Sequence, residues 1–345
     1  MRGQVLNWLR AFLSGRRQRV VLGSSTSEWC EVLSGVPQGS VLGPLLFVVF
    51  INDLPEIIQS TCKLFADDCK IMATVNEPDD CSRFQRDIDA VFGWCNEWSM
   101  ELNVNKCRVM HCGRRNPSYV YSFKDDDTPL QVTMRERDLG IIITPDMKWH
   151  DQVMSASSKA SQMLGALKKS FRTRDESVWK KLISTYIRPQ VEFAVPVWNP
   201  YQRGDIRVVE RVMRRASKVP GNLRNLDYSE RCERLGFSDL ETRSRRGDLI
   251  QQFKIAKNID QVEFVSPIQT SAPRSGKRAQ MRRELVRGCG QRHNFFINRV
   301  VNNWNELDES IIEAQSVNEF KNRLDNSTGG RRKRATIQGV VTHRG

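Results

Sequence analysis

The chain has 345 residues, of which 54 are Lys or Arg and 40 are Asp or Glu, so its formal net charge at neutral pH is +14. This length predicts about two domains with a sizeable core, and the positive excess favours a polyanionic partner, an ordinary basic protein being the alternative. No apolar run approaches the roughly 18 residues of a membrane span. Nine scattered cysteines and no secretory signal pattern exclude a disulfide-rich secreted fold, so we expect an intracellular protein with no membrane partner.

The N-terminal 33 residues predict a helix and a hairpin. Apolar residues recur at helical spacing over 4–14, and Ser14-Gly15 follows as a stop signal. Residues 16–33 then read as a hairpin that carries several arginines. Its basic side chains have two interpretations, contact with a nucleic-acid backbone or an ordinary charged surface.

The next segment has the composition of a tight loop before a buried helix. Gly35 and Gly39 permit positive φ or close backbone approach, and Pro37 fixes its own φ. Ser40 stands where an N-cap is expected, and residues 41–51 are apolar on every side. We therefore expect a helix over 41–51 that is buried all round.

Two adjacent carboxylates mark a second hairpin. Residues 62–66 and 69–75 are strand-like, which predicts that Asp67 and Asp68 occupy the two-residue turn between them. A solvated turn is the ordinary explanation, since Asp is a common turn residue. The alternative is a divalent metal site, because Mg²⁺ takes hard oxygen ligands and substrate phosphates.

Between the second hairpin and residue 149, the sequence predicts one further helix and several short strands. Apolar spacing predicts a helix over 77–100, and short strands are expected at 107–111, 130–134 and 139–144. Residues 124–127 read as a solvent loop rather than a second metal site. The pairs Cys107/Cys112 and Cys289/His293 lack a second ligand pair at zinc-finger spacing, so no zinc site is expected.

From Trp149 onward the periodicity is helical. Helices are expected over 151–171, 176–194, 205–219, 228–235 and 238–258. Basic and aromatic residues are dense in this region, which favours a nucleic-acid clamp over the solvated faces of amphipathic helices. The arginines predicted to contact nucleic acid are Arg211, Arg214, Arg215, Arg243, Arg245 and Arg246.

Three motifs of the chain are informative together, namely Ser34-Gly-Val-Pro-Gln-Gly-Ser40, Ile51-Asn-Asp-Leu-Pro55 and Phe65-Ala-Asp-Asp68. Their resemblance is to the reverse transcriptases of non-LTR (LINE-type) retrotransposons, in particular the jockey-like and chicken-repeat-like lineages. It continues through Trp98–Lys106, Asp138-Leu-Gly140 and the segment from Asn294 to Trp304.

The resemblance implies an α+β fold, with part of a polymerase palm (an antiparallel sheet with helices on one face) followed by a helical thumb and a helical tail. The implied regions are a partial palm at 1–145, a thumb at 146–260, a basic linker at 261–293, a small helical region at 294–326 and a disordered basic tail at 327–345. The basic run at 331–334 is a candidate nuclear-targeting signal, so the nucleus and the cytoplasm both stay open.

The same resemblance implies roles for individual residues. Asp67 and Asp68 would be the catalytic pair that binds Mg²⁺ or Mn²⁺, and Lys106 would lie near the pyrophosphate. Leu139 and Gly140 would belong to the primer grip. The template and incoming dNTP would be contacted by Pro37, Gln38, Gly39, Ser40 and Phe65.

The expected activity is RNA-directed DNA polymerisation, with an RNA template, a DNA primer and dNTPs as partners and no specific protein partner predicted. In this family another catalytic carboxylate comes from an earlier palm strand, and no Asp or Glu precedes Glu28. The chain therefore reads as the C-terminal part of such an enzyme and is expected to be inactive alone. The alternatives are a catalytically dead nucleic-acid-binding remnant and an intron-maturase-like RNA-binding protein.

Overall fold

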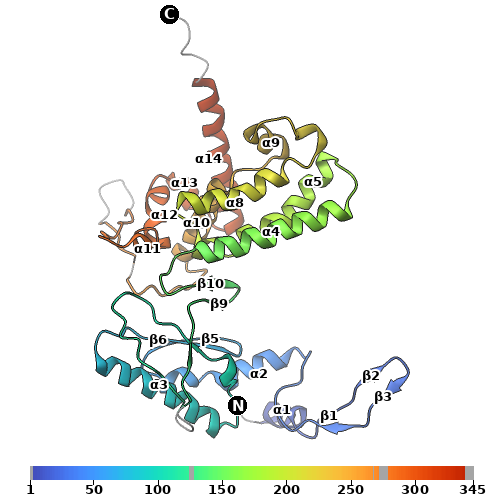
Figure 1. The fold of residues 1–345 in the computed structure, drawn as a ribbon, viewed down its shortest axis with the longest axis vertical. Helices are drawn as coiled ribbons and strands as arrows, with labels where there is room; N and C mark the ends of the chain where they lie inside the picture. Colours follow the sequence, from blue (N-terminus) through green and yellow to red (C-terminus); the bar gives the residue numbers. More distant parts are fainter. Residues whose placement is uncertain (1–2, 124–127, 267, 272–278, 339–345) are drawn as a thin grey trace, which may run out of the picture. The chain divides into compact units, whose positions relative to one another are not determined.

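The computed structural model describes residues 3–123, 128–266, 268–271 and 279–338, and it divides the chain into two compact units that meet in sequence between Thr133 and Met134 (Figure 1). The predicted loop at 124–127 lies outside the described residues. None of the helices in the described part is long and apolar enough to cross a lipid bilayer.

The first unit combines short strands with three α-helices. The helices are α1 (Gln4–Leu13), α2 (Leu42–Ile51) and α3 (Pro78–Glu97), with 3₁₀ turns at Leu54–Ile57 and Val104–Lys106. The strands are β1 (Arg17–Gln18), β2 (Val21–Leu22), β3 (Ser25–Thr26), β4 (Cys30–Glu31), β5 (Thr61–Phe65), β6 (Asp68–Met72), β7 (Arg108–Val109) and β8 (Gln131–Val132). The expected α+β composition is confirmed.

The strands pair two by two rather than in one sheet. β1 pairs with β4 and β2 with β3, which confirms the hairpin predicted for 16–33. β5 and β6 form an antiparallel hairpin, whereas β7 and β8 are parallel. In the described residues the expected multi-stranded palm sheet is therefore replaced by separate two-stranded pairs.

Helix α3 organises the core of the first unit. Val91, Trp94 and Cys95 on one side pack with Ile51 and Leu54, and the half-buried face of the β5–β6 hairpin lies against this cluster. An adjoining part of the same apolar face of α3 packs on another segment, where Ile88 lies in one cluster with Tyr121 and Phe123. The amphipathic pattern of 77–100 thus serves two apolar contacts at once.

Helix α2 is not buried as predicted. Only Gly43 and Ile51 are buried in it, while Leu45, Val48 and Val49 are 58%, 51% and 58% exposed. A helix that is apolar on every side is buried when other segments cover every side. Among the described residues, other segments pack against α2 on one side only.

The second unit is predominantly helical and begins with the hairpin of β9 (Glu136–Asp138) and β10 (Ile141–Ile143). The predicted helical segments are confirmed, with the second of them interrupted by a π-helical turn at Ile183–Ile187 that leads into α6. The helices are α4 (His150–Ser170), α5 (Glu176–Leu182), α6 (Arg188–Glu192), α7 (Val195–Trp198), α8 (Arg203–Ala216), α9 (Tyr228–Leu235), α10 (Leu240–Ala256), α11 (Gly290–His293), α12 (Phe296–Asn305), α13 (Glu309–Ile312) and α14 (Val317–Gln338).

Two apolar clusters fill this unit. The larger one joins α4 to α8 around Trp179 and Trp198, both almost fully buried. The smaller one joins α10 to α12 and α14, where Phe253 stacks on Phe320 with ring centroids 4.3 Å apart. α14 continues to Gln338 and so includes the first part of the tail that the sequence predicts to be disordered, whereas residues 339–345 lie outside the described part.

One buried carboxylate of α10, that of Asp248, links the two clusters. Arg299 on α12 forms two 2.8 Å contacts with the buried carboxylate of Asp248 and also donates to the carbonyl of Pro196, just after α7 begins. Asn199 donates to the same carboxylate at 3.3 Å. The tail helices are therefore tied to the larger cluster by ion-pair and hydrogen-bond contacts as well as by apolar packing.

Candidate active site and nucleic-acid interface

The β5–β6 hairpin presents the predicted catalytic pair at its tip, but the turn differs by one residue from the expectation. Phe65 pairs with Asp68, so the two turn residues are Ala66 and Asp67, and Asp68 is the first residue of β6. Ala66 has φ 51°, a value that costs energy for a residue other than glycine. Asp67 and Asp68 are both exposed, and Phe65 beside them is 63% exposed.

The register of the hairpin decides which side chains face the core. Alternate residues of a strand point to opposite faces, and Cys62, Leu64 and Ile71 pack against the cluster around α3. Asp68 lies on the other face with Phe65, Lys63 and Lys70. One face of the hairpin is therefore fixed by apolar contact, and the residues at its tip and on its outer face are exposed.

A buried carboxylate on α3 fixes the start of this hairpin. Asp87 is 2% exposed, and its two oxygens accept 2.9 Å hydrogen bonds from the backbone N–H groups of Gln59 and Ser60, directly before β5. These two hydrogen bonds join Asp87 to residues that precede it by 28 and 27 positions in the sequence. No sequence motif marks Asp87, and we did not predict it.

The glycines of the loop at 34–40 have positive φ, as predicted, with 73° at Gly35 and 76° at Gly39. A Cβ atom at Gly39 would meet no protein atom within 4 Å, so backbone conformation and not protein crowding requires glycine there. Gln38 and Gly39 are exposed, and Pro37 and Ser40 are half-buried. The loop thus presents an open strip of backbone to solvent.

Ser40 was predicted as the N-cap of α2, but the N-cap residue is Val41, and Ser40 contacts the first turn of the helix from one position earlier. Its hydroxyl oxygen accepts a 2.9 Å hydrogen bond from the backbone N–H of Gly43, and the hydroxyl donates to the carbonyl of Pro37 at 2.8 Å. A Cβ at Gly43 would lie 2.8 Å from that same carbonyl. Gly43 is therefore the position where close packing of loop on helix excludes any side chain, and the sequence reasoning missed it.

The side chains at the tip of the hairpin offer the type of donor atom that a hard divalent cation prefers. Carboxylate oxygens are the ligands that Mg²⁺ prefers, and this ion is commonly held by one or two carboxylates together with water and substrate phosphates. The described residues contain no group of three or more His, Cys, Asp or Glu side chains placed to hold a metal. Asp67 and Asp68 therefore offer a part of a coordination sphere rather than a closed site.

Lys106 lies in the first unit on the exposed end of the 3₁₀ turn Val104–Lys106. Its neighbour Cys107 lies near β6: burial raises the pKa of the Cys69 thiol to about 12, and the nearby thiols of Cys62, Cys95 and Cys107 add to the rise. The segment that carries Lys106 is thus brought to the side of the hairpin.

Leu139 and Gly140, the predicted primer-grip residues, form the turn between β9 and β10 in the second unit. Leu139 has φ 46° and is half exposed, and Gly140 has φ 86°. A Cβ at Gly140 would lie 3.2 Å from the ring of Phe193, which is itself 54% exposed. The turn and the aromatic ring form one exposed ridge.

The six predicted nucleic-acid-binding arginines divide into two groups. Arg243 forms a two-contact ion pair with Glu192, and Arg246 forms another with Asp325 at 2.7 and 2.8 Å. The guanidinium groups of these two residues are thus engaged inside the protein. Those on exposed surface are Arg211, Arg214, Arg215 and Arg245.

Basic residues gather where α4 and α8 end. The positive charges of Arg215 and Arg174, after burial, lower the pKa of Lys168, which shows that the three cations share one neighbourhood. Arg214 lies 4.4 Å above the ring of Tyr228. Cations at helix C-termini are also favoured by the helix dipole, so part of this clustering has a structural reason.

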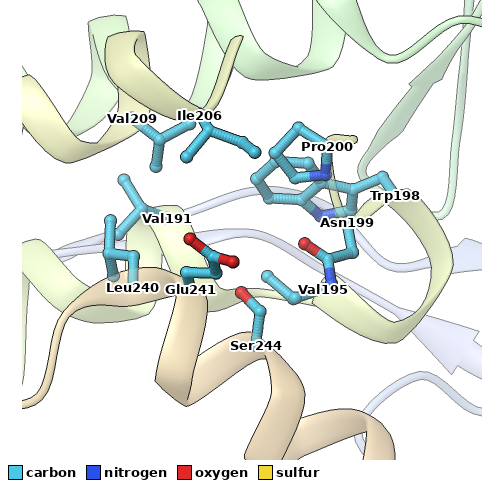
Figure 2. Close-up of a pocket in the computed structure, with 10 residues that line it drawn as sticks. All are labelled: Val191, Val195, Trp198, Asn199, Pro200, Ile206, Val209, Leu240, Glu241 and Ser244. Atoms are coloured by element: carbon cyan, nitrogen blue, oxygen red, sulfur yellow. The ribbon is translucent and has the colours of Figure 1, made fainter. Parts of the chain in front are cut away.

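A small cavity of the second unit lies between α6, α7, α8 and α10 (Figure 2). It is lined mainly by apolar side chains, together with the polar side chains of Asn199, Glu241 and Ser244, and its volume is about 30 Å³. This is room for about one water molecule. The cavity is a packing gap and not a nucleotide site.

Comparison with known proteins decides the family. Residues 2–166 match the reverse transcriptase (RNA-dependent DNA polymerase) family model. This part of the chain belongs to the reverse transcriptase family, and the chain as a whole resembles the polymerases of non-LTR retrotransposons.

Individual relatives agree with this family. The chain is 23% identical over 226 residues to the probable RNA-directed DNA polymerase from transposon X-element of Drosophila melanogaster, and 24% identical over 255 residues to the RNA-directed DNA polymerase from mobile element jockey of Drosophila funebris. These matches cover 61% and 65% of this chain but 24% and 26% of the relatives. No solved structure matches the chain.

The reverse transcriptase match contains part of the predicted site. It includes the loop at 34–40, Asp67, Asp68, Lys106 and the turn at Leu139-Gly140, whereas the arginines of α8 and α10 lie beyond it. The resemblance to the reverse transcriptases of non-LTR retrotransposons is therefore confirmed, and the residue roles stay predictions.

Proposed function

We propose that this chain supplies the metal-binding hairpin and the nucleic-acid-binding helices of an RNA-directed DNA polymerase that extends a DNA primer on an RNA template. The observation that carries the proposal is the placement of Asp67 at the exposed tip of a hairpin whose other face is packed on α3, inside the segment that matches the family. A rigid support with an exposed carboxylate is what positioned metal chemistry requires.

In this proposal Asp67 and Asp68 hold a divalent cation, which, when bound, would stabilise the developing charge on the reacting phosphate. Gln38 and the open backbone at Gly39 contact the template near the nascent base pair, since the amide both donates and accepts hydrogen bonds. Leu139 and Gly140 support the primer strand. Lys106 serves as a proton donor toward the leaving pyrophosphate.

Iron-directed cleavage tests the metal site without any need for catalysis. Fe²⁺ replaces Mg²⁺ in the protein, and ascorbate with peroxide then cuts the backbone near the bound ion. We expect cuts near residues 65–70 that Mg²⁺ suppresses and that Asp67→Asn removes. Cuts that persist in the Asp67→Asn protein, or that never occur in this hairpin, would contradict the proposal.

The 345-residue chain by itself is proposed to be inactive in primer extension, because the described residues contain no third acidic ligand near the tip. Purified protein with Mg²⁺ or Mn²⁺, an RNA template and a DNA primer should give no product above background. Template-dependent incorporation of dNTPs would show instead that another acidic residue completes the site.

A second function, nucleic-acid binding without catalysis, is favoured by the exposed cations at the ends of α4 and α8. Contacts to phosphates carry no sequence information, so this binding should be indifferent to sequence and should weaken steeply with salt. RNA and RNA–DNA hybrids are the expected ligands. The two functions are compatible, since a polymerase must also hold its template and primer.

A further inference from the structure

Two thiols lie side by side beneath the tip of the β5–β6 hairpin. The sulfur atoms of Cys62 and Cys69 are 3.7 Å apart, and neither residue takes part in a disulfide. No other pair of cysteines in the described part of the chain makes a hydrogen-bonded sulfur contact. We propose that Cys62 and Cys69 are a redox modification site, at which a reversible disulfide joins β5 to β6.

The strand register places both sulfurs on one face. Cys62 is opposite Ile71 and Cys69 is opposite Leu64, so the two cysteines are diagonal neighbours on the face that packs toward α3. Diagonal neighbours of an antiparallel pair lie farther apart than directly opposed residues, but the 3.7 Å distance between the two sulfurs means that these side chains turn toward each other. A disulfide needs a sulfur–sulfur distance of about 2.05 Å, so its closure requires side-chain rotation and a small approach of the two strands, with no change of register.

The chemistry balances with a low-molecular-weight disulfide, such as oxidised glutathione, as the oxidant. The Sγ of one of the two cysteines, as its thiolate, attacks one glutathione sulfur and releases the other half as a thiol. The Sγ of the other cysteine then attacks the mixed disulfide and releases the second glutathione. Two protein thiols are oxidised, one glutathione disulfide is reduced, and the two protons pass to the leaving thiols.

The site does not depend on polymerase activity, but its position has a consequence for the tip. Cys69 directly follows Asp68, and the bond would close a loop of eight residues, 62–69, around Asp67. Cross-linking two strands restricts their separation. The amides of β5 and β6 should therefore exchange with solvent about tenfold more slowly in the oxidised protein than in the reduced protein.

Peptide mapping tests the proposal in the 345-residue protein. After equilibration with oxidised and reduced glutathione and blocking of free thiols, trypsin cuts after Lys63 and Lys70. The expected product joins the peptide that ends at Lys63 to residues 64–70. Because the first of these peptides also contains Cys30, the map is repeated with Cys30→Ser, which should keep the linkage, and with Cys62→Ser, which should lose it.

Three results would overturn the proposal. Cys62 and Cys69 could be recovered separately blocked while other cysteines pair, or the linkage could survive in Cys62→Ser because Cys30 forms it. The same preference for this pair could also appear in denaturant, where nearness in sequence and not the fold would explain it. Should Cys62→Ser fail to fold, Cys69→Ser provides the same loss of linkage from the exposed partner.

Discussion

The carboxylate of Asp87 on α3 accepts a 2.9 Å hydrogen bond from the backbone N–H of Ser60, the last residue before β5. A second bond of the same length reaches Gln59. The start of the candidate catalytic hairpin is thus held by a buried acidic side chain that lies 27 residues later in the sequence.

Replacing Asp87 with Asn should loosen this hairpin. One of the two acceptor oxygens becomes an NH₂ group that faces a backbone N–H, and an unsatisfied buried group of this kind costs about 1–3 kcal/mol. We expect the free energy of unfolding in urea to fall by that amount and the amides of β5 to exchange faster. Asp79→Asn, at an exposed position of the same helix, is the control and should change neither.

The ion pair between Asp248 and Arg299 should be among the most sensitive contacts of the second unit. The side chains are 6% and 14% exposed, so Arg299→Met would leave a buried carboxylate without its cation and should lower the free energy of unfolding by about 3–5 kcal/mol. The matched control is Arg245→Met on α10, whose exposed contact with Glu241 is 4.0 Å long. An equal loss in both variants would show that the buried pair has no special role.

The pair of His150 and Asp205 should make stability depend on pH. The 2.7 Å hydrogen bond and the charge of Asp205, with a smaller contribution from Asp151, raise the pKa of His150 above 6.5. A raised pKa in the folded state means that the stabilisation is fully present below the unfolded pKa, about 6.5, and is lost as the pH rises through the folded value.

Urea unfolding at a series of pH values measures this effect. The wild-type protein should lose stability as the pH rises from mildly acidic to mildly alkaline, and His150→Gln should show a smaller loss over the same range. Asp205→Asn should flatten the profile in the same way. Identical pH profiles for the wild type and His150→Gln would exclude the pair as a source of the dependence.

The exposed arginines of α8 should determine the salt dependence of nucleic-acid binding. Each phosphate contact that is lost lowers the slope of log K against log salt by about 0.7–0.9, so Arg214→Gln with Arg215→Gln should reduce it by up to twice that amount. Arg207→Gln, exposed nearer the start of the same helix, is the matched control. A slope that is the same in all three proteins would mean that the C-terminal end of α8 does not touch nucleic acid.

Periodicity in the sequence predicted the helices well, because apolar spacing over ten or more residues reports directly which side is buried. It predicted the helix α2 correctly but not its exposure, because an apolar pattern on every side indicates burial and does not show which segment would cover the helix. The turn at Ala66-Asp67 was misplaced by one residue, because a turn at either place leaves the same alternate residues of both strands facing α3. The apolar pattern therefore does not distinguish the two registers, and turn composition alone does not do so either.

The site could be predicted only where its residues form a local motif. Asp67, Gly39 and Ser40 stand in short patterns and were found from them. Asp87 was missed because its partners lie 27 and 28 residues away. In the same way, Arg243 and Arg246 look like free cations in the sequence, whereas the fold pairs them with Glu192 and Asp325.

A chimaera provides the most direct test of the central claim, that Asp67 on this hairpin binds the catalytic metal of a reverse transcriptase. The segment of this chain that aligns over 255 residues would replace its counterpart in the jockey polymerase of Drosophila funebris, and extension of a DNA primer on RNA would be measured. We expect the chimaera to extend the primer, and Asp67→Asn to abolish extension while the affinity for primer–template is retained. A chimaera that binds primer–template without extending it, or an Asp67→Asn chimaera that extends as well as its parent, would contradict the claim.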